Sequence, residues 1–266
     1  METPKDVART AQRSDGFRRT ARAGFVVVGL VHIIIGVIAV SIATGGGGDA
    51  DQDGVMKVIR STPIGGLLLG GVAAALIALA IWEVAGGLLS ASRDDAKRWG
   101  RRLKMMGIAA AYLVIAGLAL VFAFGGSIES EKTMQTLSTL VLAVPGGTVL
   151  LIVLGLSVAG VGVGFFVIGI TRGFEKTMDV PDGPSHIWIV SLGIVGYLAK
   201  GIAIAVTGAL FVVAAWTQDP DKAAGLDAAL RSITALPLGE PLLWLVGVGL
   251  AIYGVFSIVR ARFARM

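Results

Sequence analysis

Long apolar stretches alternate with short polar segments along the whole chain. Six of these stretches are long enough to cross a bilayer as helices, which takes about 20 apolar residues each; they cover residues 23–43, 64–91, 105–126, 146–171, 188–216 and 240–259. The polar arm before the first stretch is not typical of a cleaved signal peptide, so we expect this stretch to remain as a helix. The pattern predicts an all-α membrane protein with six transmembrane helices.

The apolar stretches also carry an internal repeat. The segments GFVVVGLVHIIIG and GYLAKGIAIAVTG have glycines at the same three positions, namely Gly24, Gly29 and Gly36 in the first and Gly196, Gly201 and Gly208 in the second. A weaker copy, MMGIAAAYLVIAG, aligns Gly117 with Gly36 and Ala110 with Gly29. In the two stronger copies the second and third glycines are about two helical turns apart, so they share one face and favour close helix packing.

Each copy is followed by a polar loop and then by a proline. The approaches read IRSTPIGG, LVLAVPGG and ITALPLGE, and their prolines, Pro63, Pro145 and Pro237, lie 27, 28 and 29 residues after the third position of the repeat. Proline is tolerated at the start of a helix, where its missing N–H costs no hydrogen bond. Each proline therefore marks the beginning of the second span in a two-span unit.

A unit of two spans returns the chain to the side of the membrane where it began. Three such units share one orientation, so the expected architecture is three helical hairpins around a pseudo-threefold axis along the membrane normal. The predicted segments are a basic arm at 1–22, repeat 1 at 23–93, repeat 2 at 94–172, a cytoplasmic linker at 173–187, and repeat 3 with a basic tail at 188–266.

These features resemble a family of bacterial membrane proteins classed as domain of unknown function 1206, which is built from three tandem two-span repeats. The resemblance rests on RAGFVVVGLVHIIIG, GYLAKGIAIAVTG and the proline-led second spans, and it extends over almost the whole chain after residue 16. It implies a six-span fold in a bacterial plasma membrane, and it implies no activity.

Lysine and arginine are distributed unequally between the two sides of the predicted topology. The side that holds both termini carries 17 of them, and the opposite loops carry 5. Basic residues are enriched in cytoplasmic segments. The asymmetry predicts that both termini are cytoplasmic and that the loops 44–62, 127–145 and 217–239 lie outside.

The composition excludes an ordinary soluble domain. Hydrophobic residues make up 55% of the chain and the mean hydropathy is +0.82, well above the values of soluble domains. The net charge of +5 comes from basic residues scattered at span ends, which indicates contact with anionic lipid at the cytoplasmic face and no nucleic-acid partner. We therefore expect membrane lipids as partners, and a membrane protein is a further candidate.

Three ionisable residues lie well inside predicted spans: His32, Glu83 and Lys200. Such residues are costly in hydrocarbon and usually face the bundle interior with a partner. Helix rise places Glu83 and Lys200 at similar depths, about 12–18 Å from the cytoplasmic end, and we predict an ion pair between them with His32 nearby. The pair is either a structural contact between helices or part of a proton or ion relay, whereas a snorkelling lysine would need no partner.

No catalytic motif is present in the sequence. G-x-S-x-G, H-E-x-x-H, a Walker A loop and C-x-x-C are all missing, and the chain has no cysteine. We therefore expect no enzyme activity and no cofactor, and we predict a non-catalytic accessory or scaffold protein. The alternatives are a transporter of a small solute, ion or proton with a site near Glu83, Lys200 and His32, and a lipid-handling enzyme, which the sequence favours least.

The loop after the first span contains a weak metal-binding candidate. DADQDG places Asp49, Asp51 and Asp53 at alternate positions before Gly54, as in the first half of an EF-hand loop. The twelfth position is Arg60, where an EF-hand needs a bidentate glutamate, and glycines precede the loop where a helix is needed. The sequence favours a solvated acidic loop over a calcium site.

Overall fold

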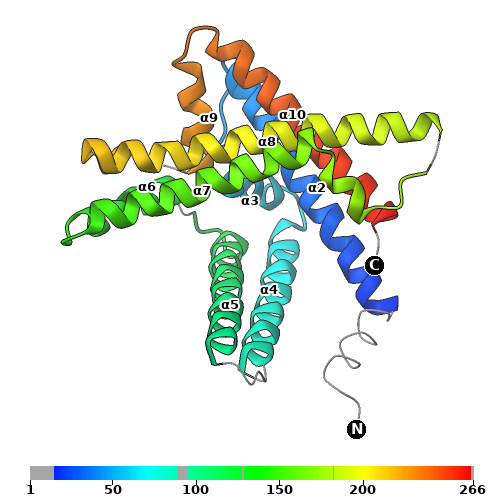
Figure 1. The fold of residues 1–266 in the computed structure, drawn as a ribbon, viewed down its shortest axis with the longest axis horizontal. Coiled ribbons are helices and arrows are strands. Elements are labelled where there is room, and N and C mark those ends of the chain that lie inside the picture. Colours follow the sequence, from blue (N-terminus) through cyan, green and yellow to red (C-terminus); the bar gives the residue numbers. More distant parts are fainter. Residues whose placement is uncertain (1–14, 89–94, 128, 182, 224, 265–266) are drawn as a thin grey trace. The chain divides into compact units, whose positions relative to one another are not determined.

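The structure, a computed structural model, describes residues 15–88, 95–127, 129–181, 183–223 and 225–264 (Figure 1). Within these residues the named elements are all helices. They form two compact units, which are described separately below. One unit comprises residues 15–54 and 130–264, and the other comprises residues 55–129.

Six of the described helices are long, and five of them have the length and apolarity needed to cross a membrane. The first unit contains α2 (Asp15–Ala43), α7 (Gly147–Ile170), α8 (Pro184–Thr217) and α10 (Gly239–Phe263), and the second contains α4 (Gly65–Leu88) and α5 (Asp95–Ala123). The exception is α4, which corresponds to the second expected span. The apolar part of α4 that the structure describes is Gly65–Ile81, which is shorter than the other five. Five spans are therefore assigned, and the count of six stays a prediction.

Short helices precede the three repeat prolines. They are α3 (Gln52–Arg60), α6 (Ser130–Leu142) and α9 (Leu226–Thr234), and single 3-10 turns lie at η1 (Gly173–Thr177) and η2 (Pro220–Lys222). In α3 and α9 the apolar residues gather on one face, as expected for a helix that lies on a packed surface. The three loops that the repeat predicts therefore share a helical segment at the same place.

Each repeat proline lies in a tight turn that ends on a glycine. The N–H of this glycine donates to the carbonyl oxygen of the residue before the proline, over 3.0 Å in 62–65, 2.9 Å in 144–147 and 2.8 Å in 236–239. The span begins at the glycine, so the helix starts two residues after the proline and not at it. A Cβ on the glycine would collide with the carbonyl oxygen six residues earlier, in the preceding short helix, which explains why glycine occupies the position.

In the first unit, α2 lies against α10 (Figure 1), and glycines line the contact seam between them. Gly29 lies opposite Gly254, and a Cβ on Gly29 would lie 2.6 Å from the Gly254 carbonyl oxygen. Gly36 lies opposite Gly247 in the same way, at 2.5 Å. With no side chains between them, the two backbones are in direct contact, which is how helices associate closely in an apolar medium.

The helices α7 and α8 also lie against each other (Figure 1), and glycines line this contact in the same way. A Cβ on Gly155 would lie 2.8 Å from the Gly208 carbonyl oxygen, and one on Gly162 would lie 2.7 Å from that of Gly201. In both seams the glycines of each helix are seven residues apart. The second span of one repeat thus packs against the first span of the following repeat, and repeat 3 packs in this way against repeat 1.

In the second unit, α4 and α5 pack against each other through alanines. Ala73 and Ala80 of α4 are buried, and so are Ala109 and Ala116 of α5. Gly117, which the sequence comparison aligned with the third glycine of the other repeats, is exposed, and a Cβ on it would meet nothing within 4 Å. The packed face of the middle repeat is therefore shifted by one residue from the sequence alignment.

Gly162 and Gly160 provide a matched test of the seam in α7. We expect Gly162→Ala to lower the melting temperature of the detergent-solubilised protein by several degrees, because its methyl group would lie 2.7 Å from the Gly201 carbonyl oxygen. Gly160→Ala should leave the melting temperature unchanged or raise it slightly, since nothing lies within 4 Å of the added carbon. Equal effects of the two substitutions would contradict a closely packed seam.

Candidate functional site

Lys200 lies midway along α8 and contacts α10 and α7. Its Nζ donates a hydrogen bond to the hydroxyl of Tyr253 (3.2 Å). The Nζ also lies 4.3 Å from the centre of the Tyr253 ring and 4.8 Å from that of Phe165. Cation–π contacts stabilise a desolvated ammonium by about 2 kcal/mol each. The lysine is therefore held by one hydroxyl and two aromatic faces.

His32 of α2 contacts the same tyrosine. The ring centres of His32 and Tyr253 are 4.8 Å apart, and His32 Nδ1 lies 2.8 Å from the Val28 carbonyl oxygen. In the tautomer with the proton on Nδ1, the histidine donates this hydrogen bond to its own helix. Two of the three ionisable residues that the sequence analysis placed inside spans, His32 and Lys200, thus lie against one side chain, Tyr253.

The third of these residues, Glu83, belongs to α4 in the second unit, and its side chain lies outside the described residues. The ion pair between Lys200 and Glu83 therefore stays a prediction. Among the side chains that the structure describes, no carboxylate lies within ion-pair distance of Lys200.

Arg260, in the last turn of α10, is a second cation of this region that the sequence analysis did not single out. Its Nη1 donates to the Tyr197 hydroxyl (3.0 Å) and its Nη2 to Thr177 Oγ1 (3.1 Å), while its Cζ lies 4.8 Å from the centre of the Phe25 ring. The sequence places Arg260 in the basic tail. Only its position seven residues after Tyr253, on the same face of one helix, points to this site.

Aromatic rings connect the two cations. Tyr197 and Tyr253 meet edge to face with their ring centres 5.3 Å apart, and Phe174 and Phe256 complete a buried cluster around them. Each tyrosine hydroxyl accepts a hydrogen bond from one cation. This cluster, which we call the aromatic cluster, therefore combines positive charge with N–H donors, an arrangement that attracts anions.

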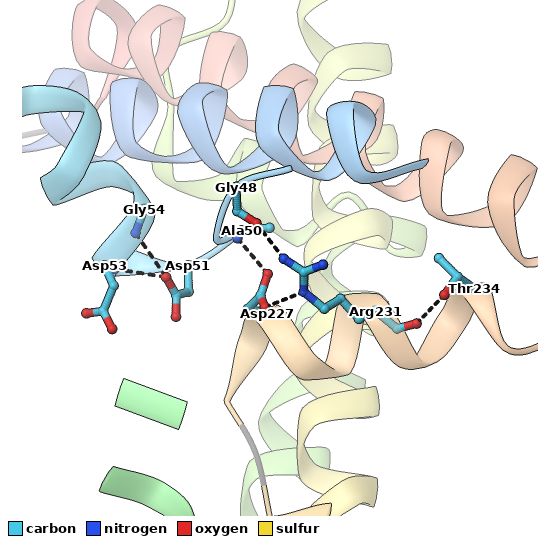
Figure 2. A network of polar contacts seen from close by, with 8 residues as sticks. All are labelled: Gly48, Ala50, Asp51, Asp53, Gly54, Asp227, Arg231 and Thr234. Atoms are coloured by element: carbon cyan, nitrogen blue, oxygen red, sulfur yellow. Dashed lines mark hydrogen bonds and ion pairs between the residues drawn. The ribbon is translucent and has the colours of Figure 1, made fainter. Parts of the chain in front are cut away.

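A second polar region lies in the loop between α2 and α3 (Figure 2). Asp51 Oδ1 accepts hydrogen bonds from the backbone N–H groups of Asp53 (2.9 Å) and Gly54 (3.1 Å), so Asp51 caps the N-terminus of α3. Asp51 and Asp53 are buried, 7% and 3% exposed, so the expectation of a solvated loop is wrong for these two carboxylates. Among the described residues no group of three or more His, Cys, Asp or Glu side chains could hold a metal ion, and the calcium alternative for Asp49, Asp51 and Asp53 stays untested.

Asp227 joins this loop to α9, as Figure 2 shows. Its Oδ1 accepts a hydrogen bond from Ala50 N (2.8 Å), and its Oδ2 accepts one from Arg231 Nε (2.6 Å). Arg231 Nη2 in turn donates to the Gly48 carbonyl oxygen (2.5 Å). Asp227 is itself buried, so an ion pair in repeat 3 holds the loop of repeat 1.

Repeat 2 makes a corresponding contact. Gln135 of α6 lies ten residues before its repeat proline, as Asp227 does in repeat 3. The Gln135 side chain donates to the Asp221 carbonyl oxygen in repeat 3 (3.3 Å). The short helix of repeat 2 therefore contacts the loop of repeat 3, and the short helix of repeat 3 contacts the loop of repeat 1. The equivalent residue in repeat 1 is Asp53.

Burial changes the acidity of this loop. Burial raises the pKa of Asp51 from 3.8 to about 6, the backbone N–H groups of Gly54 and Asp53 oppose the rise, and the carboxylates of Asp53 and Asp227 add to it. The hydrogen bond to Asp227 raises the pKa of Arg231, so this guanidinium stays charged. The loop therefore contains one carboxyl group whose pKa is raised to about 6, beside the ion pair of Asp227 and Arg231.

The chain is similar to proteins for which no activity is known. The family model described as Domain of Unknown Function (DUF1206) matches three tandem segments, 23–89, 103–172 and 195–264. The uncharacterised protein YxxB of Bacillus subtilis (strain 168) is 30% identical over 253 residues, which cover 94% of this chain and 92% of that protein. No solved structure matches the chain.

Asp51 provides a test of the buried loop by pH. Because the pKa of Asp51 is higher in the folded protein than in the unfolded chain, its charged form destabilises the fold at pH 7, and this cost disappears as the pH falls through about 6 toward 4. Asn keeps the capping oxygen without the charge. We expect Asp51→Asn to raise the melting temperature at pH 7.5 and to raise it much less at pH 4.5.

The control for this test is Asp219→Asn, which removes the charge of a capping carboxylate that is 40% exposed. Because this carboxylate is exposed, its charge carries no burial cost, so this variant should not gain melting temperature at pH 7.5. A decrease in melting temperature for Asp51→Asn at pH 7.5 would contradict the assignment of a costly buried charge.

Proposed function

The chain belongs to the family Domain of Unknown Function (DUF1206), and from this premise we propose that it is a non-catalytic accessory or scaffold protein of the bacterial plasma membrane. The observation that carries the proposal is the way the repeats are joined. Each described seam connects the second span of one repeat to the first span of the next, by backbone contact or through alanines. A body assembled in this way offers a stable surface to membrane lipids and to a membrane-protein partner.

The order of the seams supports an arrangement of the three repeats in a closed ring. Along the chain, α4 packs against α5, α7 against α8, and α10 returns to α2. Since the last pairing joins the third repeat to the first, the order is cyclic, as a pseudo-threefold axis along the membrane normal requires. The contacts that Asp227 and Gln135 make with the loop of the following repeat have the same order.

The surroundings of Lys200 favour the scaffold over a transporter. A transport site needs a polar path that water or an ion can enter. Lys200 instead packs on the rings of Tyr253 and Phe165, beside the buried aromatic cluster. Contacts of this kind hold a charge in place and rigidify the helices, which is what a structural role needs.

The ring predicts a contact between α2 and α4. Within repeat 3, Ala199 of α8 packs against Gly249 of α10, and the equivalent positions in repeat 1 are Val27 and Ala75. Because the chain has no cysteine, cysteines introduced at Val27 and Ala75 should form the only disulfide under mild oxidation. Protection of both thiols from a maleimide-linked polyethylene glycol measures its formation.

Two controls accompany this cross-link. A cysteine pair at Ala199 and Gly249 should also become protected, since these positions already touch. A pair at Val27 and Ile81 should stay reactive, because Ile81 lies six residues after Ala75 and therefore points in a different direction around α4. Failure of the first pair to cross-link while the Ala199 and Gly249 pair succeeds would refute the ring.

The scaffold role is tested with the intact protein from native membranes and in liposomes. After mild solubilisation we expect it to be recovered in a complex of constant composition. In liposomes we expect no flux of H⁺, Na⁺ or K⁺ above that of protein-free vesicles. A flux that Lys200→Met abolishes, and that Lys222→Met at an exposed site outside the spans leaves intact, would replace the scaffold by the transport alternative.

A further inference from the structure

The guanidinium of Arg260 has unused hydrogen-bonding capacity. Arginine carries five N–H donors, and Arg260 uses two of them, one toward Tyr197 and one toward Thr177. The Nε–H is among those left over, and it is buried without a hydrogen-bond partner in the described residues. A buried donor without an acceptor costs free energy, and the described residues supply no acceptor for this Nε–H.

A second positive charge lies deeper in the same region. Lys200 has only the Tyr253 hydroxyl and two aromatic faces as partners. In the described part of the chain, no carboxylate lies within ion-pair distance of either cation. Because aromatic surroundings screen charge far less than water does, the two cations act together on any anion that approaches Arg260.

The position of Arg260 puts it within reach of such an anion. It lies in the last turn of α10, four residues before Ala264, at the end of the span that the charge asymmetry predicts to be cytoplasmic. Thr177 is exposed beside it. The hydrogen bond from Asp179 N to the Phe263 carbonyl oxygen (2.7 Å) ties the end of η1 to the end of α10. Arg260 is therefore held where a span meets polar chain.

We propose that Arg260 is the centre of a binding site for a phosphate group, with Thr177 and Tyr197 positioning the guanidinium and Lys200 adding positive charge. The planar fork of arginine matches two phosphate oxygens, and the Nε–H is a donor that such an oxygen would satisfy. The phosphate comes from an anionic lipid headgroup or from a free phosphate ion. The site depends on the proposed function only for the presence of a membrane, and it does not depend on the scaffold role.

The test uses the full chain purified in a neutral detergent, with its melting temperature followed by tryptophan fluorescence. One arm adds phosphatidylglycerol to the micelles and compares it with phosphatidylcholine. The other adds inorganic phosphate and compares it with chloride at equal ionic strength. We expect phosphatidylglycerol, inorganic phosphate or both to raise the melting temperature of the wild type by several degrees. A shift with phosphatidylglycerol alone identifies a lipid headgroup, and a full shift with inorganic phosphate identifies the free ion.

Arg262 supplies a matched control, because it is exposed and lies two residues from Arg260 on the same helix. Arg260→Gln should lose at least half of the shift, and Arg262→Gln should keep it. Arg260→Lys keeps the charge but not the fork, so it should keep the fold and show a reduced shift, which gives a readout if Arg260→Gln does not fold.

Three results would overturn the site: no shift in the wild type, a full shift in both Arg260 variants, or an equal loss in Arg260→Gln and Arg262→Gln. The last of these would mean general attraction between a basic surface and anions. Each of these results leaves the cross-linking and liposome outcomes unchanged, so failure of this site is distinguishable from failure of the ring or of the scaffold role.

Discussion

Close backbone contact between helices is the constraint on which the rest of this structure depends. In an apolar medium burial of hydrophobic side chains gives little association energy, so helices are held by packing and by hydrogen bonds. Here the contact is made where Gly29 meets Gly254 and Gly162 meets Gly201, and again one heptad further along each seam. A single methyl group at these places would separate the backbones. What the three repeats share is therefore the spacing of small residues at the packed positions. They do not share a set of functional side chains.

The polar groups follow from the same arrangement. Once α10 is held against α2 and packed on α8, Tyr253 and Arg260 are carried toward Lys200, Tyr197 and the aromatic cluster. Outside the spans, the short helices that lead into the proline turns contact the next repeat through Asp227 and Gln135. Identical positions in the repeats thus carry different side chains, which shows how a repeated framework comes to hold one local site.

Much of the fold could be predicted from the sequence, while the packed face of the middle repeat could not. The apolar stretches, the spacing of the prolines and the glycine pairs predicted long helices, a helix start at each repeat proline and close packing, because these depend on local chemistry; the helices in fact start two residues after the prolines. The alignment of Gly117 with Gly36 was wrong in register, since Ala116 is buried and Gly117 is exposed. The phase of a helix is decided by its neighbour, and in this repeat Ala109 and Ala116 occupy the packed positions that glycines occupy in the other two seams.

The sequence by itself determined an all-helical chain of three repeats with apolar helices of membrane-spanning length, because hydrophobicity and small-residue spacing are properties of short segments. It also identified Lys200 and His32 as unusual residues, since a charge or an imidazole in an apolar stretch is visible without coordinates. Only the tertiary structure decided that Tyr253 contacts both of them, and that Arg260 belongs with them and not with the basic tail. Residues 197, 200, 253 and 260 lie on two helices, and their contacts exist only because the packing of those helices brings the two faces together.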